Sequence, residues 1–259
     1  MTKHGTNANT RKWKWFNIYV AMSACAGPRA PIVHLEFPNT LTIEKASMSE
    51  RRLPVYLLLD TSGSMHGEPI QSVNVGLRSM LASLRQNPYA LESVHLSITT
   101  FDSNVTDILP LTALDTLILP EITCPESGGT FLGMGLDHIC QRVEQDLVRS
   151  SAEHKGDWRP LLFIMTDGKP SDTMAYEEAI PRVKAANFAT VIACAAGPKS
   201  VPDQLKQLTD NVVSLDTMDS HAFSKFFQWV SATVTSGSST GGATSMELPP
   251  PPPEIQVVL

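Results

Sequence analysis

The segment Leu53-Pro-Val-Tyr-Leu-Leu-Leu-Asp60-Thr-Ser62-Gly-Ser64-Met65 combines an apolar run with a cluster of oxygen-bearing side chains. Residues 55–59 form an unbroken apolar run, which is typical of a central strand in a parallel sheet that is buried on both faces. The run stops at Asp60, and the hydroxyls of Ser62 and Ser64 follow at every second position. A loop that leaves the strand here can turn one carboxylate and two hydroxyls toward a single point.

Two later segments carry oxygen atoms that fit the same point. Ser127-Gly-Gly-Thr130 offers a hydroxyl beside two glycines, which allow a backbone to come close to an ion. Residues 161–165 form a second apolar strand, and Thr166-Asp167-Gly168 ends it. Oxygen ligands of this kind suit a hard divalent cation, Mg²⁺ above all, with Mn²⁺ or Ca²⁺ as alternatives. We therefore predict a metal site with five ligand residues: Asp60, Ser62, Ser64, Thr130 and Asp167.

Each segment alone also has a simpler interpretation. Serine and aspartate after a strand commonly form turns or helix caps, and Thr130 stands where a helix would take its N-cap. His66 lies beside the predicted site, but we interpret it as an exposed loop histidine because a second nitrogen ligand is lacking. The order of all three segments favours the metal, since five oxygen-bearing residues coincide.

Strands alternate with helices along the rest of the chain. We expect strands at residues 94–101 (with one less buried face), 105–111 (a sheet edge), 190–195 and 211–215. Helices are expected at residues 70–84, 132–147, 176–183 (where Pro181 implies a late start or a kink) and 203–208, and from residue 220 onward. The predicted fold class is α/β: a doubly wound, mostly parallel sheet flanked by helices in a single domain, with binding sites at the carboxyl ends of the strands.

We assign residues 48–235 to this domain, and the segments on either side of it differ in composition. In the leader, residues 1–47, a basic stretch precedes an apolar one at residues 15–25, so residues 1–26 can be interpreted as a secretory signal. We prefer a start at Met48, with the leader as an upstream misreading, because prolines break it. Residues 236–259 are predicted to be a flexible linker and a proline-rich tail. The tail is either disordered or a docking peptide, whose proline run fits an aromatic groove or whose apolar end adds a strand to a partner's sheet.

Charge and cysteine usage exclude several classes of protein. The leader carries six basic and two acidic residues, which leaves 14 of the 20 basic and 24 of the 26 acidic residues for the remainder, a net charge of −10. An acidic body argues against a nucleic-acid groove, and no apolar run has the roughly 18 residues that a membrane helix needs. Cys124, Cys140 and Cys194 are scattered without pairing or metal-binding spacing, which indicates core residues or idle thiols in a reducing compartment. A cytoplasmic location follows if the leader is discounted, and a secreted one if residues 1–26 are a signal.

The order Asp60-x-Ser62-x-Ser64, then Gly128-Gly129-Thr130, then Thr166-Asp167-Gly168 resembles the metal-ion-dependent adhesion site (MIDAS) of von Willebrand factor A domains. The segments at residues 52–60, 67–74 and 155–163 and the closing proline run are similar to TerY-type tellurium-resistance proteins of this family. The likeness covers about residues 48–259. It implies an intracellular bacterial protein of the tellurite and stress-response system, encoded with a protein kinase and a PP2C-like phosphatase, between which it acts as an adaptor.

The resulting functional hypothesis is metal-dependent protein binding without catalysis, in which a partner donates an Asp or Glu to the Mg²⁺ ion. A secreted or surface adhesion protein is one alternative. A Mg²⁺-dependent phosphohydrolase is a weaker one, because the sequence lacks both the second aspartate of the haloacid dehalogenase pattern and a glycine-rich nucleotide loop with lysine.

Overall fold

The first strand of the domain, β1 (Leu53–Asp60), is an inner strand of a seven-stranded sheet, between β2 and β4, and is buried along its whole length. The computed structural model describes residues 51–239 and 248–258, so the predicted leader lies outside the described residues. The strand order is β3-β2-β1-β4-β5-β6-β7. The other strands are β2 (Val94–Phe101), β3 (Val105–Ala113), β4 (Leu161–Thr166), β5 (Thr190–Ala196), β6 (Asn211–Leu215) and β7 (Gln256–Val257).

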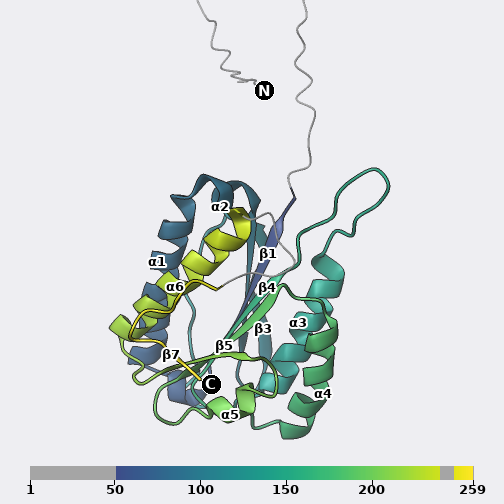
Figure 1. Ribbon diagram of the computed structural model, residues 1–259. Helices are drawn as coiled ribbons and strands as arrows, with labels where there is room; N and C mark the ends of the chain where they lie inside the picture. Colours follow the sequence, from purple (N-terminus) through teal and green to yellow (C-terminus); the bar gives the residue numbers. More distant parts are fainter. Residues whose placement is uncertain (1–50, 240–247, 259) are drawn as a thin grey trace, which may run out of the picture. The chain divides into compact units, whose positions relative to one another are not determined.

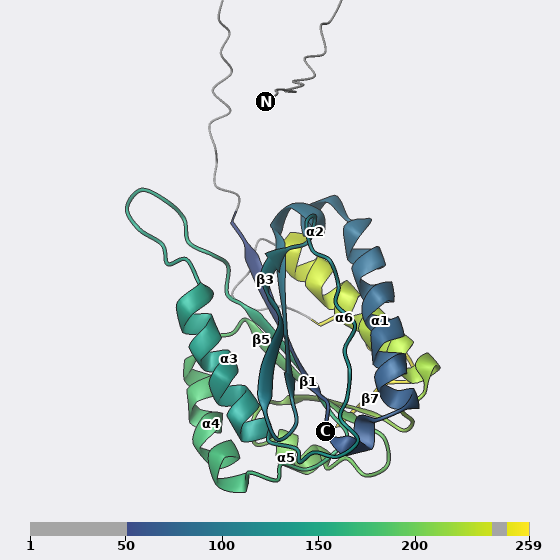
Figure 2. The same cartoon turned by 180° about the vertical axis from the view of Figure 1, so that it is seen from behind.

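The five inner strands run parallel, and each edge strand is antiparallel to its neighbour. Helices cover both faces: α1 (Glu68–Arg85), α2 (Pro88–Ser93), α3 (Leu132–Asp146), α4 (Thr173–Ala185), α5 (Pro202–Leu205) and α6 (Ser220–Ser239). In Figures 1 and 2, α1 and α6 lie on one side of the sheet and α3 and α4 on the other. The predicted α/β class, a mostly parallel sheet between helices, is confirmed.

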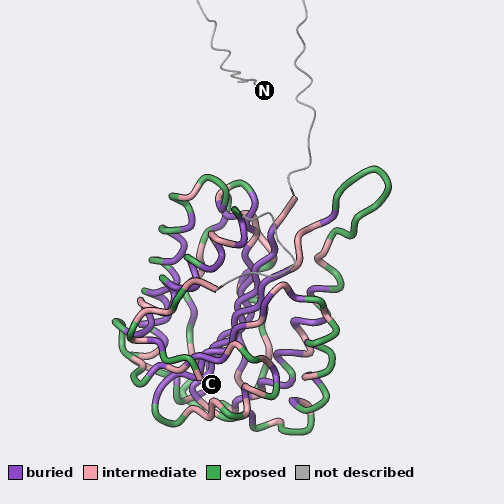
Figure 3. Tube along the Cα trace, viewed as in Figure 1, coloured by how far each residue is buried: buried purple, intermediate pink, exposed green. Residues whose placement is uncertain are grey.

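The apolar run of β1 feeds both cores because side chains alternate across a strand. Leu57 and Leu59 belong to the cluster that packs against α1 and α6, whereas Tyr56 and Leu58 belong to the cluster on α3 and α4. Figure 3 shows the buried strands between helices whose outer surfaces are exposed. A continuous apolar run is therefore what this position in the sheet requires.

The predicted less buried face of residues 94–101 is wrong. The hydroxyls on that face, Ser97 and Thr99, are buried. They stay satisfied because Ser97 donates to the carbonyl of Leu109 at 3.1 Å and Thr99 to Asp107 at 2.8 Å, both on β3. Polar side chains here mark hydrogen bonds to the edge strand, not contact with water.

The predicted late start of the helix that contains Pro181 is wrong. α4 begins at Thr173 and continues through Pro181 to Ala185. Proline leaves the carbonyl of Glu177 without its helical donor. Both residues are exposed, so water can bond that carbonyl.

The predicted boundary at residue 235 falls inside a helix, because α6 extends to Ser239 and buries Gly237 and Ser238. Of the predicted flexible tail, residues 240–247 and 259 lie outside the described residues, and residues 248–258 pack on the domain. The apolar end adds a strand, but to this domain's own sheet, since β7 pairs with β6.

The free thiols of Cys140 and Cys194 are buried in the cores as predicted.

None of the helices in the described part of the chain combines the length and hydrophobicity needed to span a bilayer.

Candidate metal site

The site is built where β1 and β4 end side by side. The two strands are parallel neighbours, with Leu59 opposite Met165, so Asp60 and Thr166 reach the same edge of the sheet. Thr166 Oγ1 donates a hydrogen bond to Asp60 Oδ2 at 2.6 Å, and the backbone N–H of Ser62 donates to Asp60 Oδ1 at 2.8 Å. Both oxygens of this fully buried carboxylate are therefore fixed in direction.

The hydroxyls of the next turn link Asp60's loop to the second carboxylate. Ser62 Oγ and Ser64 Oγ lie 3.3 Å apart, and Ser64 Oγ donates to Asp167 Oδ1 at 2.9 Å. The turn comes close to the third segment at Gly63, whose N–H donates to the carbonyl of Gly128 at 3.4 Å. A Cβ on Gly63 would lie 3.0 Å from Ser127 Cα, so only glycine fits without displacing that backbone.

Thr130 comes to the same place from the loop before α3. Its side chain lies beside the turn after β4, because a Cβ built on Gly168 would lie 3.3 Å from Thr130 Oγ1. Ser171 holds the backbone of Thr130, donating its N–H to the Thr130 carbonyl at 2.8 Å and accepting from the Thr130 N–H at 3.3 Å. The N-cap of α3 is Phe131, so the simpler interpretation of Thr130 as a cap does not hold. The structure thus brings together all five predicted residues.

The electrostatics of the cluster favour a cation. Burial raises the pKa of Asp60 to about 6, hydrogen bonds from Thr166 and Ser62 oppose that rise, and the charge of Asp167 adds to it. No ion pair among residues 51–239 and 248–258 includes Asp60 or Asp167. Two neighbouring carboxylates without a basic partner lack a compensating positive charge.

The donor set also limits the type of ion. The described residues contain no cluster of three or more His, Cys, Asp and Glu side chains that could hold a metal, so this site depends on hydroxyls. His66 is exposed, as predicted. An all-oxygen set of two carboxylates and three hydroxyls fits a hard divalent cation.

Three residues that support the site were not found from the sequence in this role. Cys124 Sγ lies 2.9 Å from the Thr61 carbonyl oxygen and 3.1 Å from that of Ser62. Asp102 follows β2, and its side chain accepts the N–H of Asn104 at 2.8 Å while its carbonyl accepts the Phe131 N–H at 3.0 Å. Asp172 caps α3 by accepting the N–H groups of its first turn. Only Asp102 had a sequence signal, its place after a strand.

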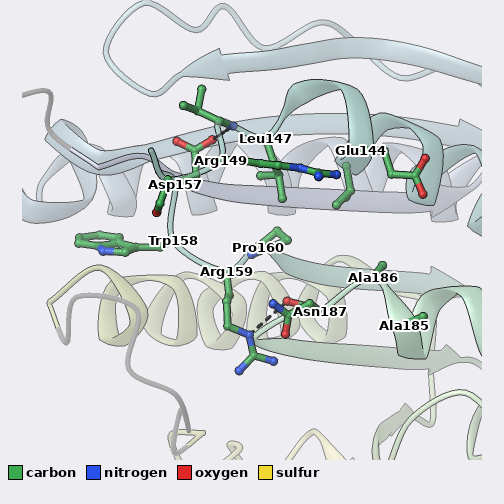
Figure 4. A pocket seen from close by; sticks show the side chains of 13 residues that line it. Glu144, Leu147, Arg149, Asp157, Trp158, Arg159, Pro160, Ala185, Ala186 and Asn187 are labelled. Atoms are coloured by element: carbon green, nitrogen blue, oxygen red, sulfur yellow. Dashed lines mark hydrogen bonds between the residues drawn. The ribbon is translucent and has the colours of Figure 1, made fainter. Parts of the chain in front are cut away.

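A hollow of about 430 Å³ lies at the other end of the sheet, where α3 and α4 end (Figure 4). Arg149 and Arg159 line it, and Arg159 donates to the carbonyl of Asn187 at 3.2 Å. The carbonyl ends of two helices point to this region, so these arginines offset a negative potential. That setting disfavours an anion site, and the candidate functional site remains at the carboxyl ends of the strands.

The fold and this cluster define a class: an α/β domain with carboxylates and hydroxyls gathered at the carboxyl edge of its sheet. A comparison with protein families matches residues 55–228 to the von Willebrand factor type A domain. The chain therefore belongs to the von Willebrand factor type A family. A comparison with curated proteins gives no match.

Solved structures of the same fold come from distant proteins. Proximal thread matrix protein 1 from the mussel byssus is 17% identical with a TM-score of 0.54, and the alignment covers 71% of this chain and 48% of that one. A von Willebrand factor type A protein from Catenulispora acidiphila is 15% identical with a TM-score of 0.54, over 72% and 43% of the two chains. The pilus adhesin SpaC from Lactobacillus rhamnosus GG is 13% identical with a TM-score of 0.53, over 72% and 30%. This chain matches less than half the length of each, and one structure of the mussel protein has a zinc-occupied MIDAS motif.

Proposed function

We propose that this chain is a protein-binding module that recognises an acidic residue of its partner through a divalent cation. The cation would be held by the five oxygen-bearing residues at the carboxyl edge: Asp60, Ser62, Ser64, Thr130 and Asp167. The observation that carries the proposal is the hydrogen-bonded cluster around buried Asp60, which holds two carboxylates and no basic partner among the described residues.

Mg²⁺ is the cation we favour, with Mn²⁺ and Ca²⁺ as alternatives. The zinc-occupied MIDAS motif of the mussel protein supports divalent binding in this family. Zinc prefers nitrogen and sulfur ligands, whereas the donors here are oxygen atoms only. Bound Mg²⁺ would supply a positive charge that can accept one further oxygen ligand.

The residues of the chain prepare the site for such a ligand. Thr166 and the Ser62 N–H orient Asp60, and Ser64 orients Asp167. Five oxygen donors leave one position open in the octahedral shell that Mg²⁺ prefers. A carboxylate oxygen from a partner's Asp or Glu then fills that position. The proposal includes no catalysis, since the function requires binding alone.

We further propose that the module works in the bacterial cytoplasm as an adaptor of the tellurite-resistance and stress-response system. The support is the resemblance of residues 48–259 to TerY-type proteins, and the partners it implies are a protein kinase and a PP2C-like phosphatase. A secreted or surface adhesion protein is the alternative, which the likeness to the SpaC fold motivates. Sequencing the amino terminus of the native protein separates the two, because a start at Met48 excludes cleavage near residue 26.

The test measures binding of the purified kinase and phosphatase to the full chain by calorimetry, in Mg²⁺ and in chelator. We expect binding in Mg²⁺ only, and loss of at least about tenfold in affinity for Asp60→Ala and Asp167→Ala. Asp115→Ala is the matched control, since Asp115 is an exposed aspartate on the segment after β3. Binding of either site variant at full affinity in Mg²⁺ would overturn the proposed site. If the chain binds neither the kinase nor the phosphatase but binds other proteins in a metal-dependent way, the adaptor role is wrong.

A further inference from the structure

The C-terminal segment, residues 248–258, occupies a groove of the domain that is separate from the metal site. In Figure 1 it runs back along α6 to β7, which pairs with β6. Its proline run meets α6 at Trp229, whose Nε1 donates to the carbonyl of Pro249 at 2.8 Å. Trp229 is buried with the segment in place, and the Pro249 carbonyl satisfies its indole N–H.

The end of the segment is anchored by one side chain and a short backbone ladder. Ile255 is 4% exposed and belongs to the core cluster on α1 and α6, whereas Val257 is 51% exposed. Val257 pairs with Val213 of β6, and the Val258 N–H donates to the carbonyl of Val212 at 2.9 Å. Ile255 precedes β7 and places its side chain in the core, whereas the backbone of the two residues after Gln256 extends the sheet.

Polar contacts hold the segment on both sides of Ile255. His221, in the first turn of α6, lies 3.3 Å from Glu254 through Nε2 and Oε1, and Gln256 donates to Asp216 at 2.9 Å. A groove that offers an indole donor, an apolar hole and a strand edge in this order is a complete site for an extended peptide.

We propose that this groove is a docking site for an extended peptide of the form proline run, apolar anchor, short strand, and that the C-terminal segment of a second copy of this chain can occupy it. Trp229, the first turn of α6 and the outer edge of β6 form this groove. In a single copy the chain fills the groove with its own segment. Exchange between two copies would keep every contact described above and link two domains.

A second copy is the occupant we infer because it carries the same segment that fits. The strand edge alone would accept many chains, since backbone ladders carry little sequence information. The Ile255 hole and the Trp229 donor select for a proline-preceded apolar anchor. The segment on the same chain has a high effective concentration, so exchange requires that the cis contact be weakened.

The first experiment uses a labelled synthetic peptide of residues 248–258 and three full-length proteins: wild type, Ile255→Asp and Val257→Asp. Ile255→Asp places a charge in the core and releases the segment, while the groove itself is unchanged. Val257→Asp is the matched control because that side chain is exposed two residues away. We expect fluorescence anisotropy to give Ile255→Asp at least about tenfold tighter peptide binding than the other two proteins.

Equal weak binding of the peptide to all three folded proteins would overturn the docking site. Circular dichroism checks that Ile255→Asp is folded. If that variant is unfolded, Ile255→Ala takes its place, because it removes the anchor without burying a charge. A peptide that carries Ile255→Asp should bind no protein. If it binds as well as the native peptide, the proposed specificity is wrong.

The second experiment tests exchange between copies by mixing two full-length variants. Ile255→Asp has an open groove and a defective segment, whereas Trp229→Ala has an intact segment and a damaged groove. We expect light scattering on a sizing column to show monomers for each variant alone and a 1:1 heterodimer for the mixture. A mixture of folded variants that stays monomeric at micromolar concentration would contradict the second copy as occupant.

Discussion

The chain itself holds the Asp60 carboxylate in one orientation. Each carboxylate oxygen accepts a hydrogen bond, one from Thr166 and one from the Ser62 N–H. The carboxylate therefore loses little rotational freedom when it binds a cation, which lowers the cost of binding. The supporting residue is Thr166, although its side chain is not among the five predicted ligands.

Thr166→Val should weaken Mg²⁺ binding by roughly tenfold without changing the fold, because the hydrogen bond that orients Asp60 is lost. Thr99→Val is the control: Thr99 is equally buried and donates to an aspartate at 2.8 Å, but on the far side of β2. Calorimetric titration with Mg²⁺ measures both. Equal affinity in the two variants would show that Thr166 only stabilises the strand end.

Asp172 connects the starts of helices α3 and α4. It precedes α4 yet accepts the N–H groups of Gly133 at 3.1 Å and Met134 at 2.8 Å, in the first turn of α3. The neighbouring Ser171 holds the backbone of Thr130. The start of α3, the start of α4 and one predicted ligand are therefore fixed by a single turn.

Asp172→Ala should destabilise the domain by about 1 kcal/mol, as loss of a helix cap does, and should also weaken metal binding through Thr130. Glu177→Ala, an exposed carboxylate on α4, serves as the control. Urea unfolding gives the free energies, and Mg²⁺ titration gives the second effect. A loss of stability with unchanged Mg²⁺ affinity would show that Asp172 caps the helix but does not position Thr130 for metal binding.

Gly76 marks the close contact of α1 with α6. A Cβ there would lie 2.3 Å from Cδ2 of Phe227, a buried ring in edge contact with Phe226. Gly76→Ala gains about 1 kcal/mol of helix propensity, but the overlap should cost about 1–3 kcal/mol. We expect a net loss in the free energy of unfolding, whereas Val75→Ala on the exposed neighbour should be near neutral. A stabilised Gly76→Ala would mean that α6 moves aside at no cost.

The elements that the sequence predicts well are those with a local cause. The bounds of β2 and β6 agree with the structure because apolar and alternating patterns mark them. The meeting of Asp60 and Asp167 could be predicted because the parallel strands that carry them end at one edge of the sheet. The cap by Asp172 and the burial of Gly237 could not, because both depend on which elements meet. The Ser-Gly-Ser-Ser composition near residue 236 favours a linker, but tertiary contacts extend α6 through it.

At the scale of the whole molecule, the metal site should couple to the stability of the domain. A cation that binds only the folded chain stabilises it by about 1.4 kcal/mol at ten times its dissociation constant. The melting temperature should rise by about 3–5 °C in Mg²⁺ and by nothing for Asp60→Ala. Scanning calorimetry with and without chelator measures the shift. An equal rise in both proteins would place the bound Mg²⁺ elsewhere.

The position of β1 has a mechanical consequence. The chain enters β1 at Leu53, at one end of the sheet, and Asp60 lies at the other end of the same strand. Tension between the amino-terminal side of the domain and a partner held at the metal site would therefore pull along β1. That strand pairs with β2 at eight positions and with β4 at five, so the load shears both ladders together instead of opening them one bond at a time. Under such a load, the two parallel ladders beside β1 would resist extension together.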